Sequence, residues 1–186
     1  MKCDLPTLVA EVNSMAHDTQ ATFGQLTLAQ LNWKPSPERW SVAQCFDHLF
    51  TSTNGYFPII ESVLAGQKRT VWQRVPFLPA FWGSLLVRSM DPASTRKVKA
   101  PKKFQPAQSD FSSAVINDFI DQQNTLAQKM KATEHLDLER IIIGSPVTSA
   151  ITYSLMDAYR LIVVHEQRHF QQAKRVTDES HFPRQD

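Results

Sequence analysis

Residues 41–64 read SVAQCFDHLFTSTNGYFPIIESVL, and they hold the clearest helical pattern of the chain. Ser41, followed three positions later by Gln44, is typical of a capping box, so a helix should begin directly after Ser41 and end near Gly66. Pro58 predicts a kink, because its ring clashes with the carbonyl one turn back. One face of this helix carries side chains at intervals of three and four, as a buried stripe requires: Val42, Phe46, Leu49, Thr53, Phe57, Ile60 and Leu64.

The same spacing predicts three further helices, over residues 6–28, 109–132 and 152–176. The connection from 67 to 109 holds five prolines, an aromatic cluster and a basic stretch, and one short helix near 79–89 is expected in it. Residues 141–143 are a candidate extended piece, but no alternation strong enough for a sheet is found. We therefore predict an all-α single domain over residues 1–186, a four-helix bundle with long crossover connections.

The composition is that of a globular protein. Its 186 residues carry a formal charge of +2, which gives no strong field to attract nucleic acid or an anionic membrane. No apolar run approaches the roughly 20 residues of a membrane span, and the first residues lack the apolar run of a signal peptide. Two cysteines are too few for a disulfide framework. We expect a cytoplasmic protein that binds neither nucleic acid nor a membrane.

The sharpest chemical feature is the pentapeptide His165-Glu166-Gln167-Arg168-His169. Histidines four apart lie on one face of a helix and can meet one metal ion, and both adjoin the apolar stripe of the last predicted helix. The alternative is a pair of polar residues on an exposed flank. The pentapeptide also matches the HExxH pattern of zinc peptidases. We disfavour a peptidase, because Gln172 and Arg175 occupy the Gly and His positions of the extended pattern.

A third ligand has to come from earlier in the chain or from the polar tail. The candidates are His17, His48, His135 and His181. His17 lies among polar residues, whereas His48 borders the buried stripe of its helix, where an unpartnered imidazole is unfavourable. Burial therefore favours His48, although spacing alone does not single it out.

Two motifs resemble the DinB-like superfamily, also called the DinB/YfiT metal-binding family. They are WSVAQCFDHL at residues 40–49 and HEQRHFQQ at residues 165–172. The family pattern of Trp-Ser-hydrophobic at a helix start, with a histidine eight residues after the tryptophan, matches Trp40, Ser41 and His48. The closing His-x-x-x-His-x-x-Gln pattern matches the second motif.

The resemblance implies a four-helix bundle with one divalent transition metal (Zn, Ni or Fe) held by His48, His165 and His169, with water in the open positions. Family members with known activity include transferases and isomerases that use low-molecular-weight thiols, and others are labelled metal-dependent hydrolases. Relatives commonly pair as dimers. The implied reaction is S-transfer from a small thiol to a small electrophilic substrate. Hydrolysis by metal-bound hydroxide and a non-catalytic metal-binding module are the alternatives.

Other residues have two interpretations each. Glu166 is a candidate catalytic base or a hydrogen-bond partner of a metal ligand, or else an exposed Glu paired along its helix. Cys45 is a soft ligand or, more simply, a small buried core residue. Asp47 and Arg168 are candidates for orienting the metal ligands or binding substrate, or else they are solvated charges. The aromatic cluster at residues 72–82 forms a lid or a buried insertion, and the basic stretch at residues 96–103 binds an anionic thiol or is solvated.

Overall fold

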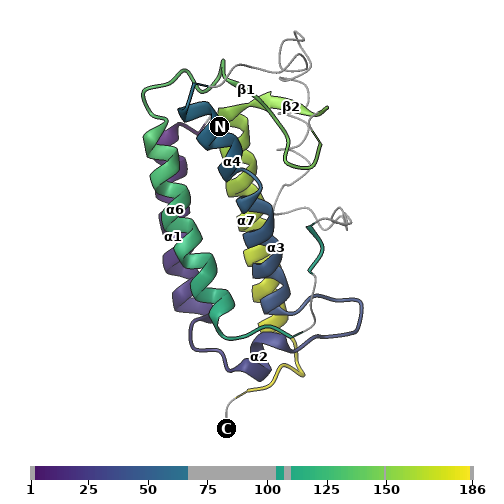
Figure 1. Cartoon of the computed structure of the whole chain (residues 1–186). Helices are drawn as coiled ribbons and strands as arrows, with labels where there is room; N and C mark the ends of the chain where they lie inside the picture. The colour runs from purple at the N-terminus through teal and green to yellow at the C-terminus, as the bar shows by residue number, and fades with distance from the viewer. Residues whose placement is uncertain (1–2, 67–103, 107–109, 149, 185–186) are drawn as a thin grey trace.

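Four long helices pack side by side in the computed structural model, which describes residues 3–66, 104–106, 110–148 and 150–184. They are α1 (Leu5–Phe23), α3 (Val42–Asn54), α6 (Ala114–Ala132) and α7 (Leu155–Thr177). Figure 1 shows that α3 and α6 run in the same direction, opposite to α1 and α7. The predicted helical bundle is therefore confirmed. The short helix, aromatic cluster and basic stretch predicted between 67 and 103 lie outside the described residues.

The start of α3 confirms the predicted capping box. The Ser41 hydroxyl accepts a hydrogen bond from the backbone N–H of Gln44, and the Gln44 side-chain oxygen accepts one from the backbone N–H of Ser41, each at 3.1 Å. Both residues are buried, so these bonds replace water for two N–H groups that the helix leaves unpaired. The cap sets where α3 begins and therefore where His48 lies along it.

The helix predicted over residues 41–66 is divided in two. After α3 ends at Asn54, α4 (Phe57–Leu64) begins with Pro58 in its first turn. A proline at 58 cannot donate to the carbonyl of Asn54 and its ring would clash with it, so the kink becomes a break. Gly55 lies at this break, where an added Cβ would come within 2.9 Å of the Cβ of Pro146. The link that follows the first strand thus packs directly on the break.

The first predicted helix was too long at its C-terminus. α1 ends at Phe23, with Gly24 as its C-cap, and a separate short helix, α2 (Leu28–Asn32), follows. Thr27 caps α2 in a second capping box with Gln30. A new helix start at Thr27 is incompatible with α1 continuing to residue 28. The helix predicted from residue 109 begins at Ala114 instead.

A two-stranded sheet was not predicted. β1 (Ile142–Gly144) includes part of the extended piece expected at 141–143, and it pairs antiparallel with β2 (Thr152–Ser154). The helix predicted from residue 152 therefore begins at Leu155, where the Ser154 hydroxyl accepts from the backbone N–H of Asp157 at 3.0 Å. Strands of three residues are too short to show an alternating pattern, so their pairing is decided by tertiary contacts.

Two apolar clusters fill the bundle. One surrounds Leu126 and Tyr159 near the sheet, and the other surrounds Phe46 and Phe119 near the opposite end of the helices. Within the described residues, no helix is both long and apolar enough to cross a membrane.

Candidate metal centre

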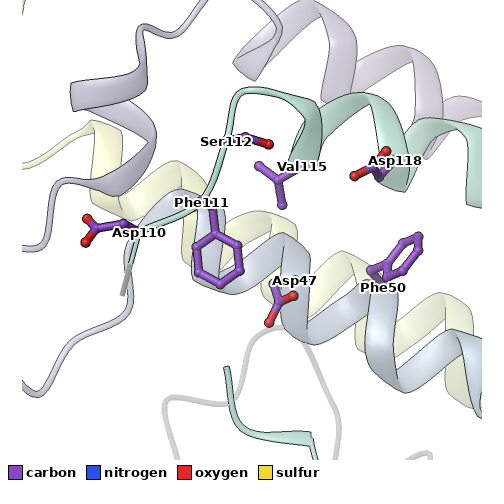
Figure 2. Close-up of a pocket in the computed structure, with 7 residues that line it drawn as sticks. All are labelled: Asp47, Phe50, Asp110, Phe111, Ser112, Val115 and Asp118. Atoms are coloured by element: carbon purple, nitrogen blue, oxygen red, sulfur yellow. The ribbon is translucent and has the colours of Figure 1, made fainter. Parts of the chain in front are cut away.

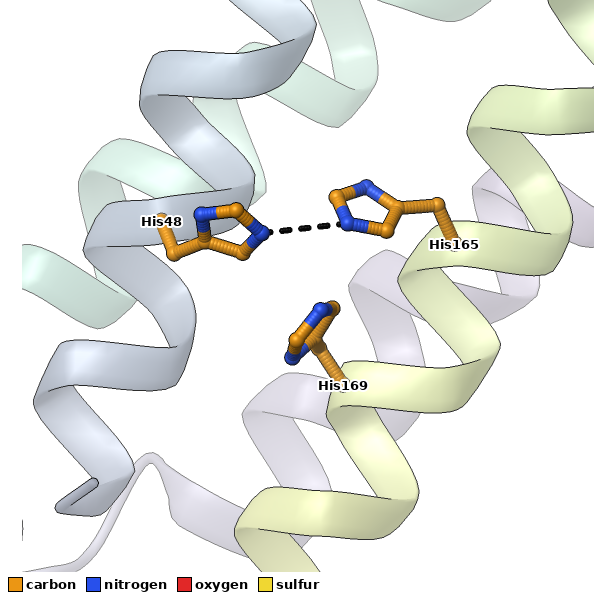
Figure 3. Close-up of side chains that lie close together, drawn as sticks. All are labelled: His48, His165 and His169. Atoms are coloured by element: carbon orange, nitrogen blue, oxygen red, sulfur yellow. Dashed lines mark hydrogen bonds between the residues drawn. The ribbon is translucent and has the colours of Figure 1, made fainter. Parts of the chain in front are cut away.

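Three histidines converge between α3 and α7. His48 projects from α3, and His165 and His169 project from α7 one turn apart, so that their rings point toward one another (Figure 3). One ring nitrogen from each residue lies within 4.8 Å of those of the other two. The ring centroid of His48 lies 5.0 Å from that of His165 and 4.6 Å from that of His169. The structure therefore brings together all three histidines that the sequence singled out.

The spacing of the nitrogens suits one shared cation. The Nε2 atoms of His48 and His165 are 3.1 Å apart. Two nitrogens that each lie about 2.0–2.1 Å from one metal ion are separated by roughly 2.8–3.4 Å for ligand angles between octahedral and tetrahedral. The Nδ1 atom of His169 is buried and has no hydrogen-bond partner among the described residues. Its loss of contact with water is therefore not offset by a hydrogen bond within the protein.

The backbone orients the ring of His48. Its Nδ1 lies 2.6 Å from the carbonyl oxygen of Phe104, and because a carbonyl only accepts, Nδ1 carries the proton and donates. In the neutral ring this leaves the Nε2 lone pair facing His165. A ligating histidine commonly holds its other nitrogen in this way, which sets the tautomer and the ring orientation.

Burial keeps these imidazoles neutral. The pKa of His48 is lowered by burial, although its bond to Phe104 acts in the opposite direction. The pKa of His165 is lowered well below its usual value, first by burial and then by the neighbouring His169 and His48. Burial, followed by the proximity of His48 and Arg168, lowers the pKa of His169 to about 3. Neutral imidazole is the form that binds metals, so the three side chains are ready to act as ligands at neutral pH.

One known protein family matches most of the chain. The sequence matches the model of the DinB superfamily over residues 12–173. The chain belongs to the DinB superfamily. The matched range contains His48, His165 and His169, and the resemblance predicted from the two motifs is confirmed. No curated protein and no solved structure gives a significant match to the chain.

The indole of Trp40 covers one side of this DinB histidine cluster. Its ring stacks on His169 with centroids 5.7 Å apart and planes inclined by 22°, and it also lies 5.0 Å from the ring of His48. Trp40 immediately precedes the Ser41 cap of α3, so the start of the helix determines its position. The sequence marked Trp40 only as part of a motif and did not predict its contact with the histidines. The Phe104 carbonyl was also missed, because a backbone acceptor has no residue signature.

Glu166 lies in the bundle interior. Its side chain is 1% exposed, and its Oε1 atom accepts hydrogen bonds from Thr53 Oγ1 at 3.2 Å and from Gln123 Nε2 at 3.0 Å. Burial raises the pKa of Glu166 to about 8, although these two hydrogen bonds act in the opposite direction. The alternative of an exposed Glu in a surface pair is therefore wrong for this DinB chain.

The remaining candidate ligands lie outside the DinB cluster, and they are either exposed or buried in apolar surroundings. His17, His135 and His181 are exposed. Cys45 is 0% exposed within the cluster of Phe46 and Phe119, and burial raises the pKa of its thiol to about 12. The simpler interpretation of Cys45 as a core residue is confirmed. Among the described residues, the only group of three or more close His, Cys, Asp or Glu side chains is the histidine cluster.

Asp47 faces a different part of the molecule. It lines a hollow of about 340 Å³ between α3 and the start of α6, and Figure 2 shows it opposite Val115 and Asp118. Burial raises the pKa of Asp47. None of the three histidines lines this hollow. The side chain of Asp47 therefore lines the hollow between α3 and α6, whereas the side chain of His48 faces α7.

Proposed function

We propose that this DinB superfamily protein binds one divalent transition metal ion through His48, His165 and His169 and transfers a low-molecular-weight thiol to a small electrophilic substrate. The observation that carries the proposal is the convergence of three imidazoles, with no Cys, Asp or Glu side chain in the same group in the described part of the chain. Three protein ligands with an open position are typical of catalytic rather than structural metal sites. Imidazole ligands suit Zn, Ni and Fe, and availability selects among them.

When bound, such an ion lowers the pKa of a thiol placed beside it and so favours the nucleophilic thiolate. The protein's own residues prepare the site for that role. Phe104 holds His48 in one tautomer, and Trp40 limits the approach of water from one side of His169. The burial that keeps the histidines neutral also strengthens electrostatic interactions within the site.

The first test is elemental analysis of the tag-free protein beside its His169→Ala variant, followed by assays of thiol conjugation and of ester or amide hydrolysis. We expect about one transition metal per chain in the wild type, its loss in the variant, and thiol turnover that disappears with it. If the protein binds metal and hydrolyses esters or amides but conjugates no thiol, it is a hydrolase and not a transferase. Metal without any turnover would indicate a binding module. Failure to bind metal after reconstitution with Zn, Ni or Fe would overturn the site. The homodimer that the family resemblance implies for this chain is tested separately by light scattering.

A further inference from the structure

Glu166 occupies the position that the HExxH pattern assigns to a general base, but its hydrogen bonds lead elsewhere. Its Oε1 atom instead accepts from Thr53 and Gln123, and all three side chains are at most 2% exposed. Across the described residues, no hydrogen bond joins Glu166 to a histidine ring.

One of these bonds joins the two helices that carry the histidines, and the other joins α7 to α6. Thr53 lies on α3, five residues after His48, and Glu166 directly follows His165 on α7. The two helices are antiparallel, and Gln123 connects the same carboxyl to α6. The Thr53–Glu166 bond therefore fixes the position of α7 along α3 about one turn from the contact between His48 and His165.

We propose that Glu166 is a positioning residue, which holds α7 against α3 and α6 so that His165 and His169 meet His48 at the spacing a metal ion requires. This inference rests on the proposed metal site and adds a role for the side chain between its two ligands. The distance tolerance of a metal site is small, about 0.2 Å, whereas a helix held only by apolar packing can rotate or slide by more than this. A hydrogen-bonded link close to the ligands restricts both motions.

A matched control exists on the same helix. Tyr159 also lies on α7 and is buried, and its hydroxyl is 3.1 Å from the Thr133 hydroxyl just beyond the end of α6. It therefore links α7 to the end of α6 by a buried hydrogen bond, as Glu166 links α7 to α6, but six residues before His165. Tyr159→Phe removes this bond with little change in shape. If buried links acted only on overall stability, Tyr159→Phe and the variants at the Glu166 link would change metal binding alike.

The experiment is a Co²⁺ titration of the metal-free full chain, followed by the visible absorption spectrum and the dissociation constant. The variants are Glu166→Leu, Glu166→Gln, Thr53→Val and the control Tyr159→Phe. We expect Glu166→Leu and Thr53→Val to weaken Co²⁺ binding by about 10-fold or more and to alter the spectrum, as loss of supporting interactions does at metal sites. Glu166→Gln should keep both close to the wild type, because its amide oxygen can accept the same two bonds and its N–H₂ replaces Oε2, which has no hydrogen-bond partner among the described residues. Tyr159→Phe should match the wild type.

The outcomes separate this inference from the proposed function. A wild-type chain that binds no Co²⁺ overturns both. If the wild type binds Co²⁺ and both Glu166→Leu and Thr53→Val bind it equally well with the same spectrum, only the positioning role is wrong. If Glu166→Gln is as defective as Glu166→Leu, the charge of the carboxylate acts on the ion and the hydrogen-bond link is not the cause. Should Glu166→Leu fail to fold, Thr53→Val still decides, since it removes one donor and leaves the carboxylate.

Discussion

The Nε2 atom of His48 lies 3.1 Å from the Nε2 atom of His165, although the two residues are 117 positions apart in the chain. Because His48 donates through Nδ1 to Phe104, its Nε2 is an acceptor in the neutral ring. Two acceptor nitrogens at this distance repel each other unless a proton or a cation lies between them. The proton of a neutral His165 fills this position only in one tautomer, whereas a metal ion satisfies both rings and His169 together.

Removal of single ligands should abolish metal binding without unfolding the bundle. We expect His48→Ala and His165→Ala each to lose the bound metal, because two imidazoles alone hold a divalent ion weakly. The far-UV circular dichroism should stay close to that of the wild type. His135→Ala is the control, since His135 is exposed and lies outside the cluster. Metal at wild-type stoichiometry in either ligand variant would contradict the assignment.

Metal binding should quench the fluorescence of Trp40. Its indole stacks on His169 at 5.7 Å, and quenching by ions such as Ni²⁺ or Cu²⁺ decreases steeply with distance. We expect a Ni²⁺ titration to lower the emission of the wild type, and the Trp40→Phe variant to lose much of that decrease. Trp33→Phe serves as the control, because Trp33 packs against Phe182 instead. An equal decrease in the wild type and Trp40→Phe would place the ion elsewhere.

The metal-free protein should become less stable as the pH falls below 6.5. His169 has a pKa of about 3 in the folded chain against about 6.5 when unfolded, and the pKa values of His48 and His165 are also lowered. Between these values the unfolded chain binds more protons, so the full contribution to stability is present above pH 6.5 and is lost as the pH falls toward 3. Each histidine contributes at most about 1.4 kcal/mol per pH unit.

Urea unfolding in the presence of a chelator, at pH 7.5, 6.5, 5.5 and 4.5, measures this dependence. The His169→Asn variant should show a shallower decrease in the free energy of unfolding than the wild type. A pH profile of the same slope in both proteins would mean that His169 is accessible to protons in the folded state.

The two thiols should differ in reactivity. Burial raises the pKa of Cys45 to about 12 and leaves it 0% exposed, whereas Cys3 is only partly buried. Since the thiolate is the reactive form, a reagent such as 5,5′-dithiobis(2-nitrobenzoate) should modify one thiol per native chain and a second only after unfolding. In the Cys3→Ala variant the native chain should be nearly unreactive. Fast modification of Cys45 in that variant would show that α3 opens readily.

The core between α3 and α6 should be sensitive to truncation. Phe119 is fully buried, and its ring lies 5.0 Å from that of Phe46. Phe119→Ala should lower the free energy of unfolding by about 3–5 kcal/mol through lost burial and the cavity left behind. Leu28→Ala, at an exposed position, should change it by less than about 0.5 kcal/mol. Urea unfolding of both variants checks the difference, and a small effect of Phe119→Ala would indicate a core that collapses around the cavity.

Local features of this fold could be read from the sequence. The Ser41–Gln44 capping box and the shared face of His165 and His169 each depend on residues three or four apart. Interactions over that distance are set by helix geometry itself, and therefore they need no knowledge of the partner helix. The two DinB motifs added the pairing of His48 with the other histidines, which burial favoured but spacing alone did not single out.

Other features were decided only by tertiary structure. The strand pair of Ile143 with Tyr153, the break that Pro146 covers, and the Phe104 carbonyl on His48 all join segments that are not neighbours in sequence. The sequence allowed Glu166 either a surface role or a role at the metal. In the structure its carboxyl is buried and bonded to Thr53 and Gln123. The physical reason is that the rotation and axial position of each helix follow from the packing of all its neighbours, whereas its periodicity follows from its own residues alone.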